Sequence, residues 1–127
     1  AARRGEELFG ELGCARCHSP ELPTARFGTI RPYTDLLLHD LGPELADGLA
    51  FGVPQAAALA PPTAAGEFRT QPLWGVSLSA PFLHDGRAET LREAIELHGG
   101  EALDSRLDFL ARPSEEQSDL IAFLEHL

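Results

Sequence analysis

Residues 13–22 read GCARCHSPEL and contain, from Cys14 to His18, the pattern C-x-x-C-H. This pattern is typical of covalent haem attachment, in which the thiols of Cys14 and Cys17 add to the two vinyl groups of one haem. The adjacent His18 is then carried beneath the iron as its proximal ligand. Many single-haem cytochromes complete the iron with a methionine, and this chain has none. The sixth ligand therefore has to be sought among other side chains.

The two cysteines fit other kinds of site less well. A thioredoxin-like C-x-x-C motif requires a βαβ context, which this chain does not offer. A zinc site requires four ligands at characteristic spacings, for example a histidine pair three to five residues apart. The histidines outside the motif include no such pair: His39, His84, His98 and His126. A disulfide framework is not expected either, since the only possible bridge would close a four-residue loop.

Helical periodicity is clearest at the two ends of the chain. Apolar residues at helical spacing predict a helix over residues 3–12, and Gly5 leaves room for another helix to cross it closely. Ser114 and Gln117 have the spacing of a capping box, which predicts a second helix from there to Leu127. We expect these two terminal helices to cross.

Three shorter helices are expected between the terminal ones. Thr34 is a candidate cap for a helix over residues 35–40, and Thr90 with Glu93 forms a capping box that opens a helix over residues 91–98. A third helix is expected over residues 101–111, with an inward face of leucines: Leu103, Leu107 and Leu110. Residues 43–66 show no clean period and are expected to form a long loop that wraps over another part of the fold.

These elements predict an all-α fold without strands. The expectation is a class I cytochrome c-like domain, with crossed N- and C-terminal helices around one covalent haem. No repeat or boundary divides residues 1–127, so we expect a single domain.

The composition bears on partners and location. Ten arginines and no lysine face twenty carboxylates, a formal charge of −10, which disfavours binding to nucleic acid and to anionic lipid. A basic protein partner is the natural complement; the alternative is that net acidity serves only to keep the domain soluble. No apolar run approaches the ~20 residues of a membrane span. Covalent haem is attached outside the bacterial cytoplasm, so a periplasmic or other extracytoplasmic location is expected, with a leader or upstream domain preceding these residues.

Several segments together resemble a known family: GCARCH, IRPYTDLLLHDLGPELADG, EFRTQPLWGVSLSAPFLHDGRAETLREAIELHGGEA and DLIAFLEHL. The chain is similar to the C-terminal haem domain of bacterial di-haem oxidoreductases, thiol-oxidoreductase-like proteins related to the di-haem cytochrome c peroxidases and the MauG group. The resemblance implies an upstream haem domain. With a single C-x-x-C-H, the chain is either half of such a protein or a single-haem relative.

The resemblance also suggests which residues surround the haem. A carbonyl near Pro32 is expected to accept the Nδ1–H of His18. Apart from the resemblance, Arg69, Arg87 and Trp74 are candidates for binding the haem propionates. The alternative for either arginine is a surface salt bridge, and for Trp74 it is core packing or a place at an edge through which electrons leave. His84 is expected near the haem without binding iron, or bonded locally.

His98 is the predicted sixth ligand. It falls on one helix face with Leu91, Ala94 and Ile95, and Gly99 ends the helix directly after it. In the related peroxidases a methionine ligates iron fourteen residues after the HDG histidine, and MauG-like proteins have a tyrosine there; the same count from His84 reaches His98. The alternatives are His39, or a helix-end role for His98. His39 is otherwise a packed core histidine, and His126 is expected to be exposed.

Three functions remain open at this point. The first is a c-type cytochrome domain that carries electrons through a bis-histidine haem. The second is a peroxidase-type catalytic domain, which requires an open iron position and an acid–base group such as His39 or His84. The third is a haem-stabilised docking domain. The expected partner is a basic redox protein or an upstream haem domain.

Overall fold

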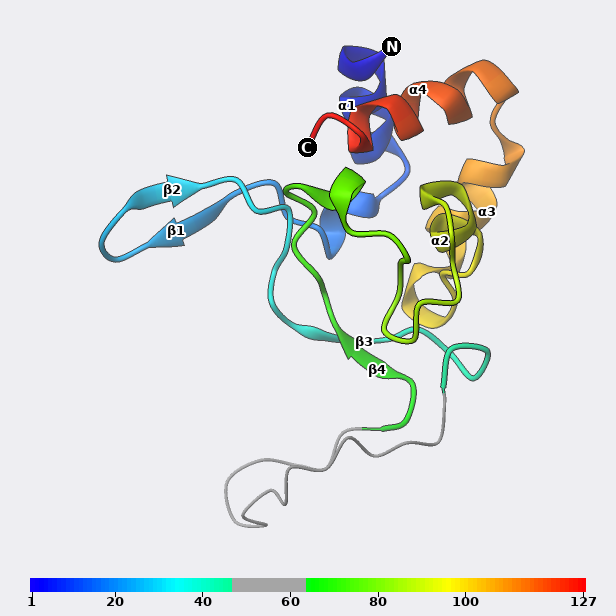
Figure 1. Cartoon of the computed structure of the whole chain (residues 1–127), viewed down its shortest axis with the longest axis horizontal. Coiled ribbons are helices and arrows are strands. Elements are labelled where there is room, and N and C mark those ends of the chain that lie inside the picture. The colour runs from blue at the N-terminus through cyan, green and yellow to red at the C-terminus, as the bar shows by residue number, and fades with distance from the viewer. Residues whose placement is uncertain (47–63) are drawn as a thin grey trace.

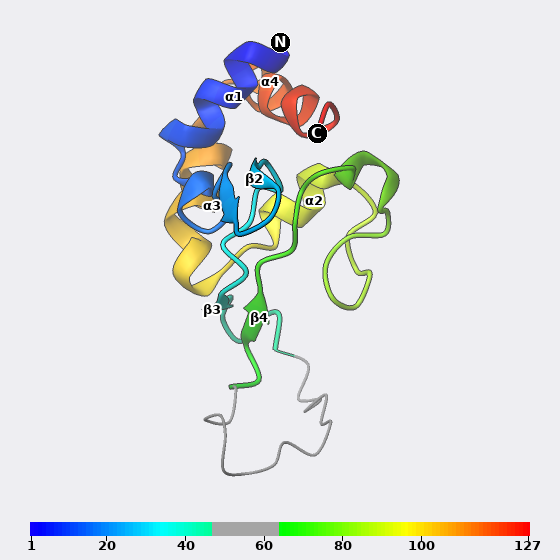
Figure 2. The same cartoon turned by 90° about the vertical axis from the view of Figure 1, so that its left-hand side faces the viewer.

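The computed structural model describes residues 1–46 and 64–127. Helices α1 (Ala2–Glu11) and α4 (Ser114–Leu124) cross at one end of the molecule (Figures 1 and 2). At their crossing a Cβ atom added to Gly5 would overlap the backbone carbonyl oxygen of Asp119. The predicted contact between the terminal helices, and the place of Gly5 in it, are confirmed.

The main core lies beneath this crossing. Three aromatic rings form its centre: Phe9, Tyr33 and Phe123 pack edge to face with ring centres 5.5–5.9 Å apart. Around them lie further buried apolar side chains: Leu8, Leu12, Val76, Phe109, Leu120 and Leu124. The residues that surround the C-x-x-C-H motif are thereby fixed to both ends of the chain.

The all-α prediction is wrong. Two small antiparallel sheets accompany the helices: β1 (Leu22–Thr24) pairs with β2 (Gly28–Ile30), and β3 (Leu38–Asp40) pairs with β4 (Glu67–Arg69). The first forms a hairpin that projects from the body (Figure 1). The second joins segments far apart in sequence, a pairing that local periodicity does not reveal. The fold is mixed, with four α-helices and four short strands among the described residues.

The helix expected after Thr34 does not form. The Thr34 side chain is buried and its hydroxyl donates to the Thr70 carbonyl oxygen at 2.7 Å, while the Thr34 hydroxyl oxygen accepts from the amide of Leu36 at 3.0 Å. Residues 38–40 pair with β4 instead. Thr34 therefore ties two chain segments together rather than capping a helix.

The helices near the C-terminal end agree in part with the predictions. The Thr90–Glu93 capping box is confirmed and opens α2 (Leu91–Glu96), which ends two residues earlier than expected. Short 3₁₀ turns, η1 (Cys14–Arg16), η2 (Val76–Leu78) and η3 (Gly100–Ala102), connect the elements. The capping box at Ser114 is wrong: Pro113 occupies the cap position, and the Gln117 amide donates to two carbonyls of the preceding turn.

The leucine face predicted for the third helix is wrong as well. In α3 (Leu103–Ala111) the exposed fractions are 41% for Leu103, 51% for Leu107 and 44% for Leu110. Phe109 is the buried residue, at 1%. One large ring outweighed three leucines in choosing the inward face, because it completes the core against α1 and α4.

Two further expectations concern the long loop and membrane-spanning helices. The predicted loop over residues 43–66 lies largely outside the described residues, which include only its two ends. Among the described helices, none is both long and apolar enough to cross a membrane.

Candidate cofactor site

A cavity of about 490 Å³ lies at the centre of the fold, between the terminal helices, α2 and the β3–β4 sheet. Both cysteines line it: Cys14 begins the turn η1 directly after α1, and Cys17 follows that turn. Both are free thiols. His18 and His98 line the same cavity, and its remaining walls are mainly apolar. A volume of this size lies within the usual range for cofactor sites.

His18 is held by the backbone of Tyr33. The ring nitrogen Nδ1 lies 3.1 Å from the Tyr33 carbonyl oxygen. Tyr33 has a positive φ of 56°, an uncommon conformation for a bulky residue, and its ring is fixed by Phe9 and Phe123. The Arg31 guanidinium adds a 2.8 Å hydrogen bond to the Tyr33 hydroxyl. Tertiary packing thus sets the carbonyl that orients His18.

His98 approaches the cavity from the other side. It follows α2 by two residues, and its Nδ1 lies 2.6 Å from the Ala94 carbonyl oxygen. The residues expected to share its face, Leu91, Ala94 and Ile95, all line the cavity with it. Because each histidine uses Nδ1 as a donor to a carbonyl, Nε2 carries the lone pair in the neutral ring.

The two imidazoles lie at a separation that suits a shared metal. Their ring centres are 6.5 Å apart, with an angle of 48° between the ring planes. An imidazole nitrogen lies about 2 Å from a metal that it binds, so two rings on opposite sides of one ion have centres about 6 Å apart. The residues present therefore fit an iron between His18 and His98, with the cysteines on the cavity wall.

Burial keeps these side chains in the neutral state. It lowers the pKa of His18 to about 4, against the opposing effect of the Tyr33 carbonyl, and it also lowers the pKa of His98. Burial raises the pKa of Cys14 to about 11 and raises that of Cys17. Neutral imidazoles are the form that binds metal. The protonated thiols disfavour thiolate redox chemistry.

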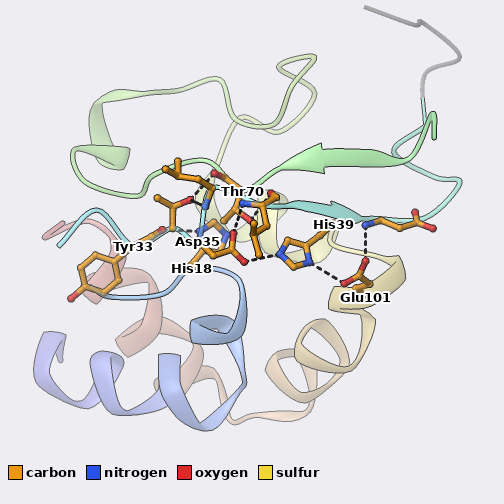
Figure 3. A network of polar contacts seen from close by, with 10 residues as sticks. His18, Tyr33, Asp35, His39, Thr70 and Glu101 are labelled. Atoms are coloured by element: carbon orange, nitrogen blue, oxygen red, sulfur yellow. Dashed lines mark hydrogen bonds and ion pairs between the residues drawn. The ribbon is translucent and has the colours of Figure 1, made fainter. Parts of the chain in front are cut away.

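A polar network around His39 borders the cavity beside Cys17. Figure 3 shows its hydrogen bonds. The His39 ring lies between two carboxylates, with Nε2 2.8 Å from Asp35 and Nδ1 2.9 Å from Glu101. Ligand atoms of Cys17, Asp35 and His39 all lie within 4.8 Å of one another. Hydrogen bonds to Glu101 and Asp35 raise the pKa of His39. Both nitrogens of His39 are thus engaged by carboxylates, unlike those of His98.

Of the other residues predicted to contact the haem, some lie at the cavity and some do not. The carbonyl facing His18 belongs to Tyr33, the residue after the buried Pro32. Arg69 lines the cavity from β4. Trp74 is 55% exposed, and neither it nor Arg87 is among the residues that line the cavity. Arg87 donates to Asp85 and, at 2.7 Å, to the Glu44 carbonyl.

The two remaining histidines lie in different surroundings. His84 lines the cavity, and its ring stacks on Phe68 with centres 4.1 Å apart. Nε2 of His84 also lies 3.9 Å from Asp85. His126 is exposed, and its Nδ1 is bonded to the Ala122 carbonyl.

Sequence reasoning missed two features of this site. The network of Asp35, His39 and Glu101 joins residues that are distant in sequence, and only the Asp35–His39 spacing was visible beforehand. The Thr34–Thr70 bond, which supports the same wall, was hidden by the expectation of a helix cap. Both depend on the β3–β4 pairing.

Fold and site together define a haem oxidoreductase domain. The family model described as "Di-haem oxidoreductase, putative peroxidase" matches residues 1–127. The chain belongs to the di-haem oxidoreductase family.

Individual relatives agree with this family. The methylamine utilization protein MauG of Methylorubrum extorquens is 36% identical over 99% of this chain, and the cytochrome-c peroxidase IdrP1 of Pseudomonas sp. (strain SCT) is 29% identical over 98%. The chain spans only 34% and 39% of those proteins. Among solved structures, hydrazine synthase of Kuenenia stuttgartiensis matches with a TM-score of 0.60 and 24% identity, covering 99% of this chain and 46% of that one. That last likeness concerns the fold alone.

Proposed function

We propose that this domain carries electrons through one covalently attached c-type haem with two histidine ligands. Cys14 and Cys17 form the thioether bonds, His18 is the proximal ligand and His98 is the sixth ligand. The observation that carries the proposal is the 6.5 Å separation of the two imidazole rings across the cavity. When bound, the haem supplies a one-electron ferric/ferrous couple.

The chain's own residues support this role. The Tyr33 and Ala94 carbonyls bind Nδ1 of His18 and of His98 and so fix the orientation of both rings. Nε2 of each ring is then available to the iron without a large rearrangement. Arg69 on the cavity wall is suited to bind a propionate, and Arg87 and Trp74 remain further candidates. The mainly apolar walls limit access of water. A preorganised, six-coordinate site favours electron transfer, because little has to move when the charge of the iron changes.

The alternative is a peroxidase-type catalytic domain, which the name of one relative and the family description suggest. Such chemistry requires a vacant iron position and an acid–base group near it. His98 stands across the cavity from His18, and both nitrogens of His39 are engaged by carboxylates. These two observations favour electron transfer at this haem.

The setting that we propose follows from the family and the chemistry. The relatives are about three times as long as this chain, so the domain acts beside a further haem domain or with a separate redox protein. Covalent haem attachment places it outside the bacterial cytoplasm. One domain, residues 1–127, contains the whole site.

The test is the optical spectrum of the haem-loaded protein and of His98→Ala. The parent should be low-spin in the ferric state, and His98→Ala should become high-spin or bind added ligands. His98→Met provides a second variant: it should remain six-coordinate with a higher reduction potential, because a thioether ligand raises the potential. His39→Ala is the matched control and should leave the spin state unchanged. A low-spin spectrum that persists in His98→Ala and changes in His39→Ala would overturn the assignment.

A further inference from the structure

The segment that forms one wall of the cavity carries exposed apolar side chains on its outer side. Trp74 is 55% exposed and Leu78 is 90% exposed, beside and within η2. From the same segment Leu73, Val76 and Ser79 line the cavity. The segment thus presents one set of side chains to the cofactor site and another to solvent.

An open groove of about 780 Å³ adjoins this exposed patch. Ser77, which lies between Trp74 and Leu78 in the sequence, lines the groove together with residues of α2 and α4. Its apolar surface includes Phe82, Leu91, Ile121 and Ala122. Patch and groove are therefore continuous with one another.

The charges along the groove are acidic. Glu89 and Glu125 line it, and no ion pair to either side chain occurs within residues 1–46 and 64–127. Arg92 is the one basic residue of the lining. Its guanidinium bonds Gln117 at 2.6 Å, lies 3.7 Å from Glu96 and covers the Phe109 ring. The positive charge of Arg92 is thus offset locally, which leaves an acidic rim on a chain of net charge −10.

We infer that Trp74, Leu78 and the acidic groove beside them form the docking surface for a basic redox protein. The partner would present an apolar patch ringed by lysine or arginine. Exposed tryptophan is enriched at the energetic centres of interfaces, and complementary charge at the rim speeds association and selects the partner. The inference rests on the proposed electron-transfer function.

Docking at this surface brings the partner against the outer side of the cavity wall. A haem held by Cys14, Cys17, His18 and His98 would there exchange one electron with the partner's redox centre. One centre is oxidised and the other is reduced by one electron, and no bond forms or breaks. A second copy of this chain is a poor occupant, because its acidic surface would repel the acidic rim.

The hairpin β1–β2 offers a matched control. Phe27 at its tip is 75% exposed, as prominent as the patch, and Arg26 lies over its ring at 5.6 Å. The hairpin projects away from the helices, and Phe27 does not line the cavity (Figure 1). If exposure alone decided, truncating Phe27 or Trp74 would weaken binding of the partner equally. The docking inference predicts that only truncation of Trp74 weakens it.

The experiment measures binding of a lysine-rich mitochondrial cytochrome c to the haem-loaded protein by calorimetry, with both proteins ferric so that no electron passes. Trp74→Ala and Leu78→Ser should each raise the dissociation constant about tenfold, the usual effect of truncating a central interface residue. Phe27→Ala should change it less than about twofold. Leu78 is so exposed that Leu78→Ser leaves the core intact, which protects the test against a misfolded Trp74→Ala.

Charge variants test the rim separately. Glu125→Gln should weaken binding and reduce its dependence on salt, whereas Glu115→Gln, at the opposite end of α4, should alter neither. Equal effects of Phe27→Ala and Trp74→Ala would overturn the inference. So would self-association of the protein that Trp74→Ala abolishes.

A separate measurement distinguishes an error in the electron-transfer function from an error in the docking surface. The rate at which dithionite reduces the haem reports on electron transfer without protein docking, and it should be the same in the parent and in Leu78→Ser. A parent that dithionite does not reduce, or that does not return to the ferric state on reoxidation, would contradict the electron-transfer function. A normally reducible parent whose binding ignores Trp74 and Leu78 would contradict only the docking surface.

Discussion

The two walls of the cavity are built differently. The His18 wall rests on α1, α4 and the three rings of Phe9, Tyr33 and Phe123, whose exposed fractions are at most 6%. The His98 wall is formed by the six-residue helix α2 and the two residues after it, together with β3. The leucines before and at the start of β3 are about half exposed: Leu36, Leu37 and Leu38. The first wall is stabilised by packing within the protein. The second depends more on hydrogen bonds and, we propose, on the bond from His98 to the haem.

The largest expected effect separates covalent attachment of the haem by the two cysteines from binding of its iron by His98. The double variant Cys14→Ala, Cys17→Ala should carry no covalent haem, because both thioether bonds are lost, whereas His98→Ala should keep it. The measurement is the mass of the denatured protein after expression with the c-type maturation machinery. Haem that stays bound to the double variant, or a parent without any haem adduct, would contradict attachment at this motif.

The next effect tests the packing of the His18 wall. Gly5→Ala should lower the free energy of unfolding by about 3 kcal/mol, because the added methyl group overlaps the Asp119 carbonyl and forces α1 and α4 apart. Gly10→Ala is the control on the same helix: an added Cβ there meets nothing within 4 Å. It should raise the free energy of unfolding by about 1 kcal/mol, the difference in helix propensity.

Urea denaturation of the two haem-loaded variants measures this contrast. Similar changes in both would show that the crossing of α1 and α4 is looser than the structure has it. Because the variants share a helix and a substitution, they differ only in what the new methyl group meets.

The difference between the walls also explains what could be predicted from the sequence. The terminal helices, the Thr90–Glu93 capping box and the common face of Ala94, Ile95 and His98 depend on neighbours within a few residues, and periodicity finds such features. The β3–β4 pairing joins segments distant in sequence, so local periodicity predicts a helix over residues 35–40, where the structure has β3 instead. The inward face of α3 was missed because its leucines fit a helical pattern while Phe109 alone fits the core.

The motif residues were located by sequence, but their orientation was not. Cys14, Cys17 and His18 are recognisable from spacing alone. The carbonyl that holds His18 depends on the positive φ of Tyr33, which tertiary packing imposes. The network of His39 likewise needs Glu101 to arrive from η3.

The smallest expected effect concerns this network, which ties β3 to η3 in the His98 wall. Bonds to Glu101 and Asp35 raise the pKa of His39 above its ordinary value of about 6.5, so the stability that the protonated ring adds is fully present below that pH. It is lost as the pH rises through the raised pKa. The His39 bond lowers the pKa of Glu101. At Asp35 burial has the largest single effect and raises the pKa, but the bonds from His39, the Leu37 amide and Thr70 together outweigh it, so the contribution of both carboxylates is lost only in stronger acid. The free energy of unfolding of the parent should therefore exceed that of His39→Gln most clearly between about pH 4.5 and 6.5 and approach it at alkaline pH.

The effect should be smaller than that of Gly5→Ala, because solvent screens the partly exposed Glu101. Urea denaturation across this pH range, with Glu101→Gln as a second variant that shrinks the same difference, measures it. A gap that widens above pH 7 would show that the His39 proton does not stabilise this wall.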